Sequence, residues 1–320
     1  MRRKSMLALV KWWKNSVEFS ALIRKQPFFN MKDIIKLIRV PQWIKNLFVF
    51  IPVVYSRNLF HPDYLVKSIT AFIIFCLLSS VVYVINDIVD AEADRHHPVK
   101  KNRPVASGKI SSADALTIAI VLFAIGVFLS IFTNVMFIIF ASLYLAINII
   151  YTFKLKHIVL LDIFSIATGF MIRVTAGAVI ISVEISSWLI LTTMFLSLFL
   201  AVMKRRSELY VMGDELSSTR KVLEYYSPNF IDQLAAITAA GVIISYALYT
   251  VSQRTITVFQ TEHLIYTTPF VVYGIFRYMF LVINRNKGEN TTEIMVTDIS
   301  MIVNILLYGL TTILLVYKLI

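Results

Sequence analysis

The chain has 320 residues, of which 58% are hydrophobic and only 16% are charged, and its mean hydropathy is +0.74. Water-soluble domains of this length rarely have such a composition, so the sequence predicts a polytopic membrane protein and excludes a soluble enzyme. The net charge of +12 does not indicate a nucleic-acid partner, because the Lys and Arg residues gather in particular loops, as topology signals do. The single cysteine, Cys76, excludes an intramolecular disulfide and a cysteine metal site.

Residues 1–40 form a separate basic segment. The stretch MLALVKWWKNSVEFSALIRK mixes apolar and aromatic residues with Lys and Arg at roughly helical intervals, which predicts a helix lying on the cytoplasmic leaflet. A partly disordered basic tail is the alternative. A cleaved signal peptide is not expected, because Lys11 interrupts the first apolar run after five residues. We therefore expect an interfacial segment over 1–40 and a membrane domain over 41–320.

Nine apolar runs follow along the chain, and each is long enough to cross a hydrocarbon core of about 30 Å. Lipid satisfies no backbone polar group, so these runs predict helices and an all-α fold. The predicted spans cover residues 43–60, 66–86, 113–133, 135–152, 158–180, 186–203, 232–252, 264–283 and 297–317.

The Lys and Arg residues alternate in number from loop to loop across these nine spans. Of the 31, 26 lie on the side of the N-terminus, four lie on the opposite side, and Arg173 lies within a span. Because cytoplasmic loops carry the excess of Lys and Arg, this asymmetry predicts a multi-pass protein of the inner (cytoplasmic) membrane with its N-terminus in the cytoplasm.

The second span ends in the stretch NDIVDAEADRHHPVKKNRP, residues 86–104. Asp87, Asp90 and Asp94 are three and four residues apart, so they share one face of a continuous helix, with Tyr83 one turn earlier. Their repulsion, a few tenths of a kcal/mol per pair on an exposed helix, is greater near a membrane and needs a compensating cation. Carboxylate oxygens suit Mg²⁺, which also binds substrate phosphates, so the stretch predicts a magnesium site.

Basic residues follow the acidic ones directly. Lys100, Lys101 and Arg103 would hold phosphate oxygens beside the metal, and the cytoplasmic end of the span would carry the active site. The alternative is that these charges only mark the point where the helix leaves the membrane. Carboxylates at a membrane edge favour the functional interpretation.

The pattern Asn86-Asp87-x-x-Asp90-x-x-x-Asp94, followed by Arg103 and Pro104, resembles the NDxxDxxxD…RP signature of the UbiA superfamily of intramembrane prenyltransferases. The resemblance implies a nine-helix bundle with a central cavity that opens to the cytoplasm. It also implies Mg²⁺-assisted diphosphate chemistry.

Four further stretches, at 39–52, 151–177, 199–209 and 273–298, resemble the decaprenyl-phosphate phosphoribosyltransferases within that superfamily. The resemblance implies transfer of 5-phosphoribose from 5-phosphoribosyl diphosphate to a polyprenyl phosphate, for synthesis of a cell-envelope sugar donor. The loop KRRSELYVMGDELSSTRK, after the sixth span, has no clear second DxxxD motif and begins with cations, which fits two phosphorylated substrates.

Several residues outside the acidic stretch are candidates for substrate contact, although interfacial anchoring or topology explains some of them equally well. Asp162 and Arg173 lie eleven residues apart on nearly one face, which predicts a functional pair or a structural ion pair. His96 and His97 are interpreted as loop residues. The expected substrate-binding residues are Lys45, Asn46, Tyr83, Asn86, Lys101, Arg103, Tyr151, Lys154, Lys156, Asp162, Arg173, Lys204, Arg205 and Glu208.

Two alternatives remain at the level of function. One is a prenyltransferase of the same fold that acts on an aromatic quinone precursor or on haem. The other is a cation-coupled transporter, which is disfavoured because the sequence has no internal repeat and its acidic residues cluster at one membrane face. The oligomeric state is left open.

Overall fold

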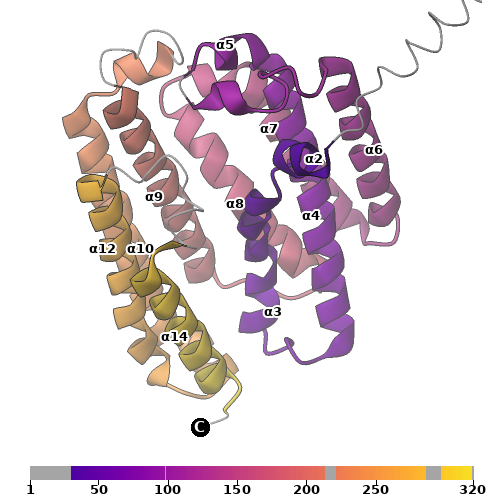
Figure 1. Cartoon of the computed structure of the whole chain (residues 1–320). Helices are drawn as coiled ribbons and strands as arrows, with labels where there is room; N and C mark the ends of the chain where they lie inside the picture. The colour runs from indigo at the N-terminus through magenta and orange to yellow at the C-terminus, as the bar shows by residue number, and fades with distance from the viewer. Residues whose placement is uncertain (1–29, 98, 213–220, 286–296, 319–320) are drawn as a thin grey trace, which may run out of the picture.

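The helices of the chain run side by side and are joined by short connections (Figure 1). The structure is a computed structural model that describes residues 30–97, 99–212, 221–285 and 297–318, so most of the expected N-terminal segment lies outside the described residues. The helical elements, including short 3₁₀ segments labelled η, are α2 (Met31–Leu37), η1 (Val40–Phe50), α3 (Ile51–Tyr55), α4 (Pro62–Val89), α5 (Ala91–Arg95), η2 (Lys100–Asn102), α6 (Ser112–Ser130), α7 (Val135–Phe153), η3 (Leu155–His157), α8 (Leu161–Ile180), α9 (Ser187–Met212), η5 (Lys221–Tyr225), α10 (Pro228–Val251), α11 (Gln253–Phe259), η6 (His263–Thr267), α12 (Thr268–Arg285) and α14 (Ile299–Val316).

Eight helices of the described chain are long and apolar enough to cross a membrane, and a ninth span is present if the bent pair at the N-terminal end counts as one. This confirms the all-α, multi-pass architecture that the apolar runs predict. The eight are Pro62–Val89, Ser112–Ser130, Val135–Phe153, Leu161–Ile180, Ser187–Tyr210, Pro228–Val251, His263–Asn284 and Ile299–Val316.

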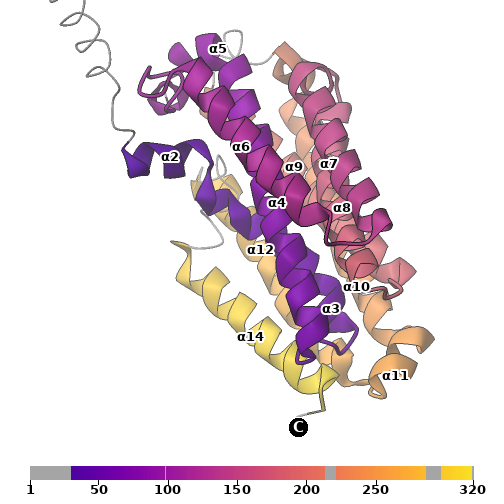
Figure 2. The ribbon, with the colours of Figure 1, turned by 90° about the vertical axis from the view of Figure 1, so that its right-hand side faces the viewer.

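The first predicted span is not one straight helix. The chain bends by 47° between α2 and the segment Val40–Tyr55, and α2 lies across the bundle rather than along it (Figure 2). Most of that segment is 3₁₀ helix, with Pro41 near its start and Pro52 at the start of α3. Arg39, at the bend, has the left-handed backbone angles φ 54° and ψ 50°, which a residue with a side chain adopts only at a cost.

The second span also differs from the prediction of a continuous helix through residue 94. Helix α4 ends at Val89, Asp90 has φ −91° and ψ 3°, and a separate short helix, α5, begins at Ala91. The backbone N–H of Asp94 still donates to the Asp90 carbonyl oxygen at 2.8 Å, so the chain keeps turning across the break. The expectation of one continuous helix that carries all three carboxylates is therefore wrong.

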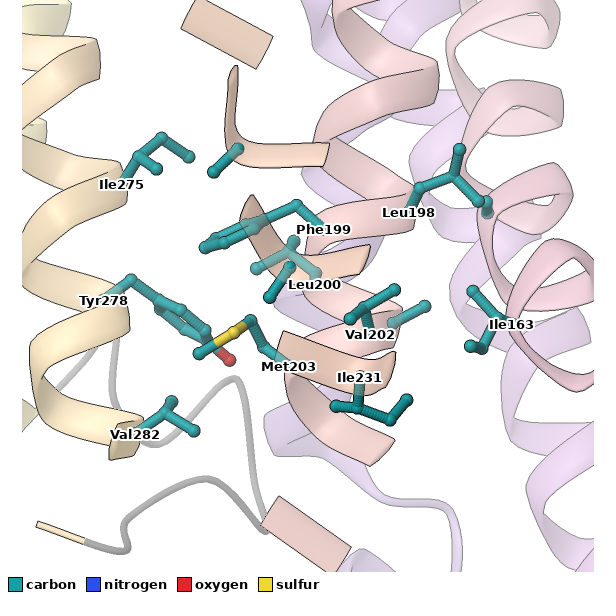
Figure 3. Close-up of a cluster of buried hydrophobic side chains, with 14 of the residues drawn as sticks. Ile163, Leu198, Phe199, Leu200, Val202, Met203, Ile231, Ile275, Tyr278 and Val282 are labelled. Atoms are coloured by element: carbon teal, nitrogen blue, oxygen red, sulfur yellow. The ribbon is translucent and has the colours of Figure 1, made fainter. Parts of the chain in front are cut away.

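A cluster of buried apolar side chains joins α8, α9, α10 and α12. Figure 3 shows Phe199 and Met203 of α9 directed towards Tyr278 of α12, and the rings of Phe199 and Tyr278 meet with centroids 5.7 Å apart. Burial of this surface fixes α9, which carries several of the charged candidates towards its C-terminal end, against its neighbours.

Helix α8 packs directly against η1 at Gly177. A Cβ atom at this position would lie 2.2 Å from the carbonyl oxygen of Val49, so the two backbones approach too closely for any side chain. Nearby, the rings of Phe48 and Phe170 meet edge-on with centroids 4.9 Å apart. This contact holds η1 against α8, beside the candidate site.

We expect Gly177→Ala to lower the free energy of unfolding by about 1–3 kcal/mol, because the added methyl group must displace the backbone of η1. Gly309→Ala in α14 is the control, since a Cβ there meets no atom within 4 Å. Removing a glycine from that helix interior stabilises it by up to about 1 kcal/mol. Thermal unfolding of the detergent-solubilised protein measures both, and a wild-type midpoint for Gly177→Ala would contradict the close contact.

Candidate active site

A cavity of about 620 Å³ lies among η1, α4, α7, α8, α9 and the loop after α5. Its lining is strongly positive, with seven Lys or Arg residues against two carboxylates, which makes it suited to anions. These residues are Lys36, Arg39, Lys45, Lys100, Arg103, Arg173, Lys204, Asp87 and Glu208.

Asp87, near the end of α4, is only 1% exposed and is held by two guanidinium groups. Its Oδ1 accepts a hydrogen bond from Nη2 of Arg39 and lies 3.3 Å from Nη1 of Arg103. The same nitrogen of Arg103 lies 2.5 Å from Oδ2 of Asp94, so one guanidinium bridges two of the expected metal ligands. The Oδ2 atom of Asp87 is buried and finds no hydrogen-bond donor among the described residues.

Arg39 is a site residue that the sequence analysis missed. Its strained backbone directs the side chain towards α4, where the guanidinium also lies over the ring of Tyr83 at 4.8 Å from the centroid. The negative carboxylate of Asp87 and the electron-rich face of the Tyr83 ring both stabilise the positive charge of the Arg39 guanidinium. The partner could not be found from sequence spacing, because 48 residues separate Arg39 from Asp87.

The three expected magnesium ligands do not gather into one cluster. Asp90 is turned towards η3, where its Oδ1 lies 2.6 Å from Nζ of Lys156, while Asp87 and Asp94 share Arg103. The described residues contain no group of three His, Cys, Asp or Glu placed to hold a metal ion. The unsatisfied Oδ2 of Asp87 nevertheless fits Mg²⁺, which takes one or two carboxylates and completes its shell with water and substrate phosphate.

A second charged network lies behind the cavity, centred on the fully buried Arg205 of α9. Its Nε lies 2.5 Å from Oδ2 of Asp162, its Nη1 donates to Glu208, and its Nη2 donates to the Tyr151 hydroxyl at 3.0 Å. Tyr226 donates to the other oxygen of Asp162 at 2.6 Å, and burial together with this hydrogen bond raises the pKa of Tyr226. The network fixes Glu208 and Tyr151, both of which line the cavity.

Arg173, in α8, is 5% exposed and does not pair with Asp162, so the expectation of an ion pair between these two residues is wrong. Its Nε donates to Oδ1 of Asn46 at 2.7 Å. Its Nη1 and Nη2 donate to the Gly169 carbonyl and the Tyr144 hydroxyl, both at 2.8 Å. The residue thus joins η1, α7 and α8 while lining the cavity.

Nine of the expected site residues line the cavity: Lys45, Tyr83, Asn86, Asp87, Arg103, Tyr151, Arg173, Lys204 and Glu208. Four others, Asn46, Asp94, Asp162 and Arg205, belong to the hydrogen-bonded shell behind it. Asp90 and Lys156 pair with each other, and Lys101 and Lys154 are exposed and do not line the cavity.

His97 is not the plain loop residue that the sequence suggested. It is 3% exposed, lines the cavity, and its Nδ1 accepts the backbone N–H groups of Val99 and Lys100 at 3.2 and 3.3 Å. Burial, followed by the positive charge of Lys100, lowers the pKa of His97, which favours the neutral ring that accepts these bonds. The residue therefore shapes the basic loop against the cavity.

The chain is similar to known membrane transferases over most of its length. The model of the UbiA prenyltransferase family matches residues 48–295. A decaprenyl-phosphate phosphoribosyltransferase of Corynebacterium glutamicum is 35% identical over 231 residues, which are 71% of this chain and 70% of that protein. The enzyme of the same name from Mycolicibacterium smegmatis is 35% identical over 70% of this chain and 71% of its own.

Solved structures with the same fold are more distant in sequence. A UbiA homolog from Archaeoglobus fulgidus bound to GPP and Mg²⁺ has a TM-score of 0.65 and 16% identity, with 89% of this chain and 97% of that chain covered. The structure of a digeranylgeranylglyceryl phosphate synthase has a TM-score of 0.60 and 19% identity, with 90% and 99% covered. These likenesses confirm the fold predicted from the acidic signature.

The buried network around Arg205 makes a prediction about stability. We expect Tyr226→Phe to lower the free energy of unfolding by about 1–3 kcal/mol, because a buried oxygen of Asp162 then loses its donor. The neighbouring Tyr225 is 73% exposed, so Tyr225→Phe is a matched control that we expect to stay within about 0.5 kcal/mol of wild type. Denaturant unfolding in detergent compares the two variants, and equal midpoints would rule out the role given to Tyr226.

Proposed function

The chain belongs to the UbiA prenyltransferase family, and as a membrane-embedded transferase of that family we propose that it moves 5-phosphoribose from 5-phosphoribosyl diphosphate to a polyprenyl phosphate. The products would be polyprenyl-phosphoryl-5-phosphoribose and diphosphate. The observation that carries the proposal is the excess of cations in the cavity, seven against two carboxylates. Two phosphorylated substrates would balance this charge better than one diphosphate and a neutral aromatic acceptor.

The diphosphate of the donor would bind beside Asp87. Arg39 and Arg103 already converge there, and Lys100 of the adjoining loop lines the same cavity, so the phosphate oxygens would enter a positively charged environment. Asp87 would hold Mg²⁺ through its unpaired Oδ2 atom. The other two ligands expected from the sequence motif, Asp90 and Asp94, are paired with Lys156 and Arg103. Mg²⁺ in such a site neutralises the charge that develops on a leaving diphosphate.

The reaction would replace one bond at ribose C1 by another. The bond from C1 to the diphosphate oxygen breaks, and an oxygen of the lipid phosphate attacks C1, which has oxocarbenium character in glycosyl transfer. A phosphate monoester is already anionic near neutral pH, so the attack needs no strong general base. The cationic lining would stabilise negative charge on the departing diphosphate and hold the attacking phosphate close to C1.

The soluble donor requires a site open to the cytoplasm, and the excess of Lys and Arg on the side of the N-terminus supports that orientation. We propose an inner-membrane enzyme whose product supplies a sugar donor for the cell envelope. The names of the similar enzymes from Corynebacterium glutamicum and Mycolicibacterium smegmatis support the reaction.

A direct test supplies radiolabelled 5-phosphoribosyl diphosphate, Mg²⁺ and a panel of lipid phosphates to the purified protein, and follows label into the organic phase. The proposal requires label transfer that depends on both the lipid phosphate and Mg²⁺. EDTA should stop the transfer, and added Mg²⁺ should restore it. Parallel reactions contain a prenyl diphosphate with aromatic acceptors. Prenyl transfer without phosphoribosyl transfer would replace the proposal by the prenyltransferase alternative, and cation flux in liposomes without chemistry would favour a transporter.

Asp87→Asn should reduce phosphoribosyl transfer by about 100-fold or more, because it removes the charge that holds the metal while keeping the size of the side chain. Asp63→Asn is the matched control, since Asp63 is an exposed acid in the first turn of the same helix. Initial rates at saturating Mg²⁺ measure the effect. An Asp87→Asn protein with most of its activity would remove Asp87 from the metal site.

Arg103→Ala should raise KM for 5-phosphoribosyl diphosphate by about 10-fold or more, because a charge-assisted contact to phosphate is lost. We expect a smaller rise in KM for the lipid phosphate. Arg95→Ala is the control, since Arg95 is half exposed, pairs with Glu92 and does not line the cavity. A larger rise in KM for the lipid phosphate than for 5-phosphoribosyl diphosphate would mean that Arg103 contacts the lipid substrate instead of the soluble donor.

A further inference from the structure

Arg173 is a buried cation without a carboxylate partner among the described residues. Its three hydrogen bonds run to an amide oxygen, a backbone carbonyl and a tyrosine hydroxyl, none of which carries negative charge. The rings of Tyr144, Phe170 and Phe75 surround the guanidinium, with centroids at 4.6, 5.4 and 6.0 Å from Cζ. A guanidinium has five N–H donors, so two stay available to a ligand in the cavity that Arg173 lines.

This cation lies deeper in the bundle than Asp87. Arg173 comes twelve residues after α8 begins, which is about 18 Å of helix, whereas Asp87 comes two residues before α4 ends, which is about 3 Å. Those two helix ends lie together, because Lys156 just before α8 pairs with Asp90 just after α4. The cavity therefore holds positive charge at two separate depths.

Two lysines reinforce the charge of Arg173. Lys45 of η1 and Lys204 of α9 line the same cavity as Arg173. Neither lysine forms an ion pair in the described part of the chain, although Glu208 lies near enough to Lys204 to offset part of its charge. Positively charged side chains in one cavity repel one another, and a bound anion offsets this repulsion.

We infer that Arg173, Lys45 and Lys204 form a second phosphate subsite, which binds a phosphate monoester apart from the diphosphate held beside Asp87. The identity of the ligand rests on the proposed function, in which both substrates carry such a group: the acceptor as its lipid phosphate, the donor as its 5-phosphate. Arg173 is oriented by Asn46 and Tyr144, so the structure keeps the guanidinium in place before the ligand arrives.

The test measures binding without turnover, from the rise of the thermal unfolding midpoint of the purified full chain with ligand concentration. The probes are farnesyl phosphate for the lipid phosphate, ribose 5-phosphate for the donor's 5-phosphate, and inorganic pyrophosphate with Mg²⁺ for the diphosphate. Arg173→Gln is compared with wild type, with Arg173→Lys, and with Arg277→Gln as a matched control. Arg277 pairs with Asp298 and does not line the cavity.

We expect Arg173→Gln to weaken binding of one phosphate monoester by about 10- to 100-fold, the usual effect of losing charge-assisted contacts to phosphate. The affinity of Arg173→Lys for that monoester should lie between those of wild type and Arg173→Gln. The affinity of each variant for pyrophosphate should stay within about twofold of wild type. The affected monoester identifies the source of the phosphate. Loss confined to pyrophosphate, or equal loss for all three probes in a folded variant, would overturn the subsite.

If Arg173→Gln unfolds in detergent, Lys45→Gln decides the matter, because Lys45 belongs to the same cluster and makes none of the buried hydrogen bonds that join the helices around Arg173. Weaker monoester binding with normal pyrophosphate binding again supports the subsite. Selective monoester binding in a protein that transfers no phosphoribose would keep the subsite and overturn the proposed function. Phosphoribosyl transfer by the wild type, with monoester binding unchanged in the variant, would overturn the subsite and keep the proposed function.

Discussion

Charge inside the bundle lies in surroundings of low polarity, where an ion without a counter-ion or hydrogen bonds is costly. Asp162 and Arg205 are both 0% exposed, and each is the other's counter-ion. Their remaining hydrogen-bonding groups are bound by Tyr226, Tyr151 and Glu208. The charges of the neighbouring cavity are not balanced in this way, because its lining has seven cations and only two carboxylates. The excess is tolerable in an open cavity with water or anions present, and it makes the cavity suited to anions.

The same ionic contacts also hold the cavity together. Arg103 ties the loop after α5 to α4 through Asp87, and Lys156 ties η3 to the end of α4 through Asp90. Arg173 joins η1 to α7 and α8 through side chains that carry no charge. Residues far apart in the chain thus position one another, so that the lining of the cavity and the arrangement of helices depend on a common set of side chains.

The number of spans and the acidic end of the second span could be predicted from sequence, because apolar run length and residue spacing are local properties. The side-chain partners at the bend and at the break could not, since Arg39 pairs with Asp87 and Asp90 pairs with Lys156, which are distant in the chain. For Asp162, helical spacing pointed to Arg173, whereas packing of α8 against α9 brought Arg205 closer. Sequence periodicity shows which residues share a helix face and does not show which helix faces them.

The pairing of Asp87 bears on how the proposed reaction would begin. One oxygen of this carboxylate is bound by Arg39 and Arg103, while the other is buried without a donor. A diphosphate entering the cavity offers both guanidinium groups oxygens of higher charge than a carboxylate, which favours their transfer to the substrate. That exchange would free Asp87 for a cation as the anion arrives, so donor and metal would assemble at the site together. The strained backbone of Arg39 places its side chain where it reaches both partners.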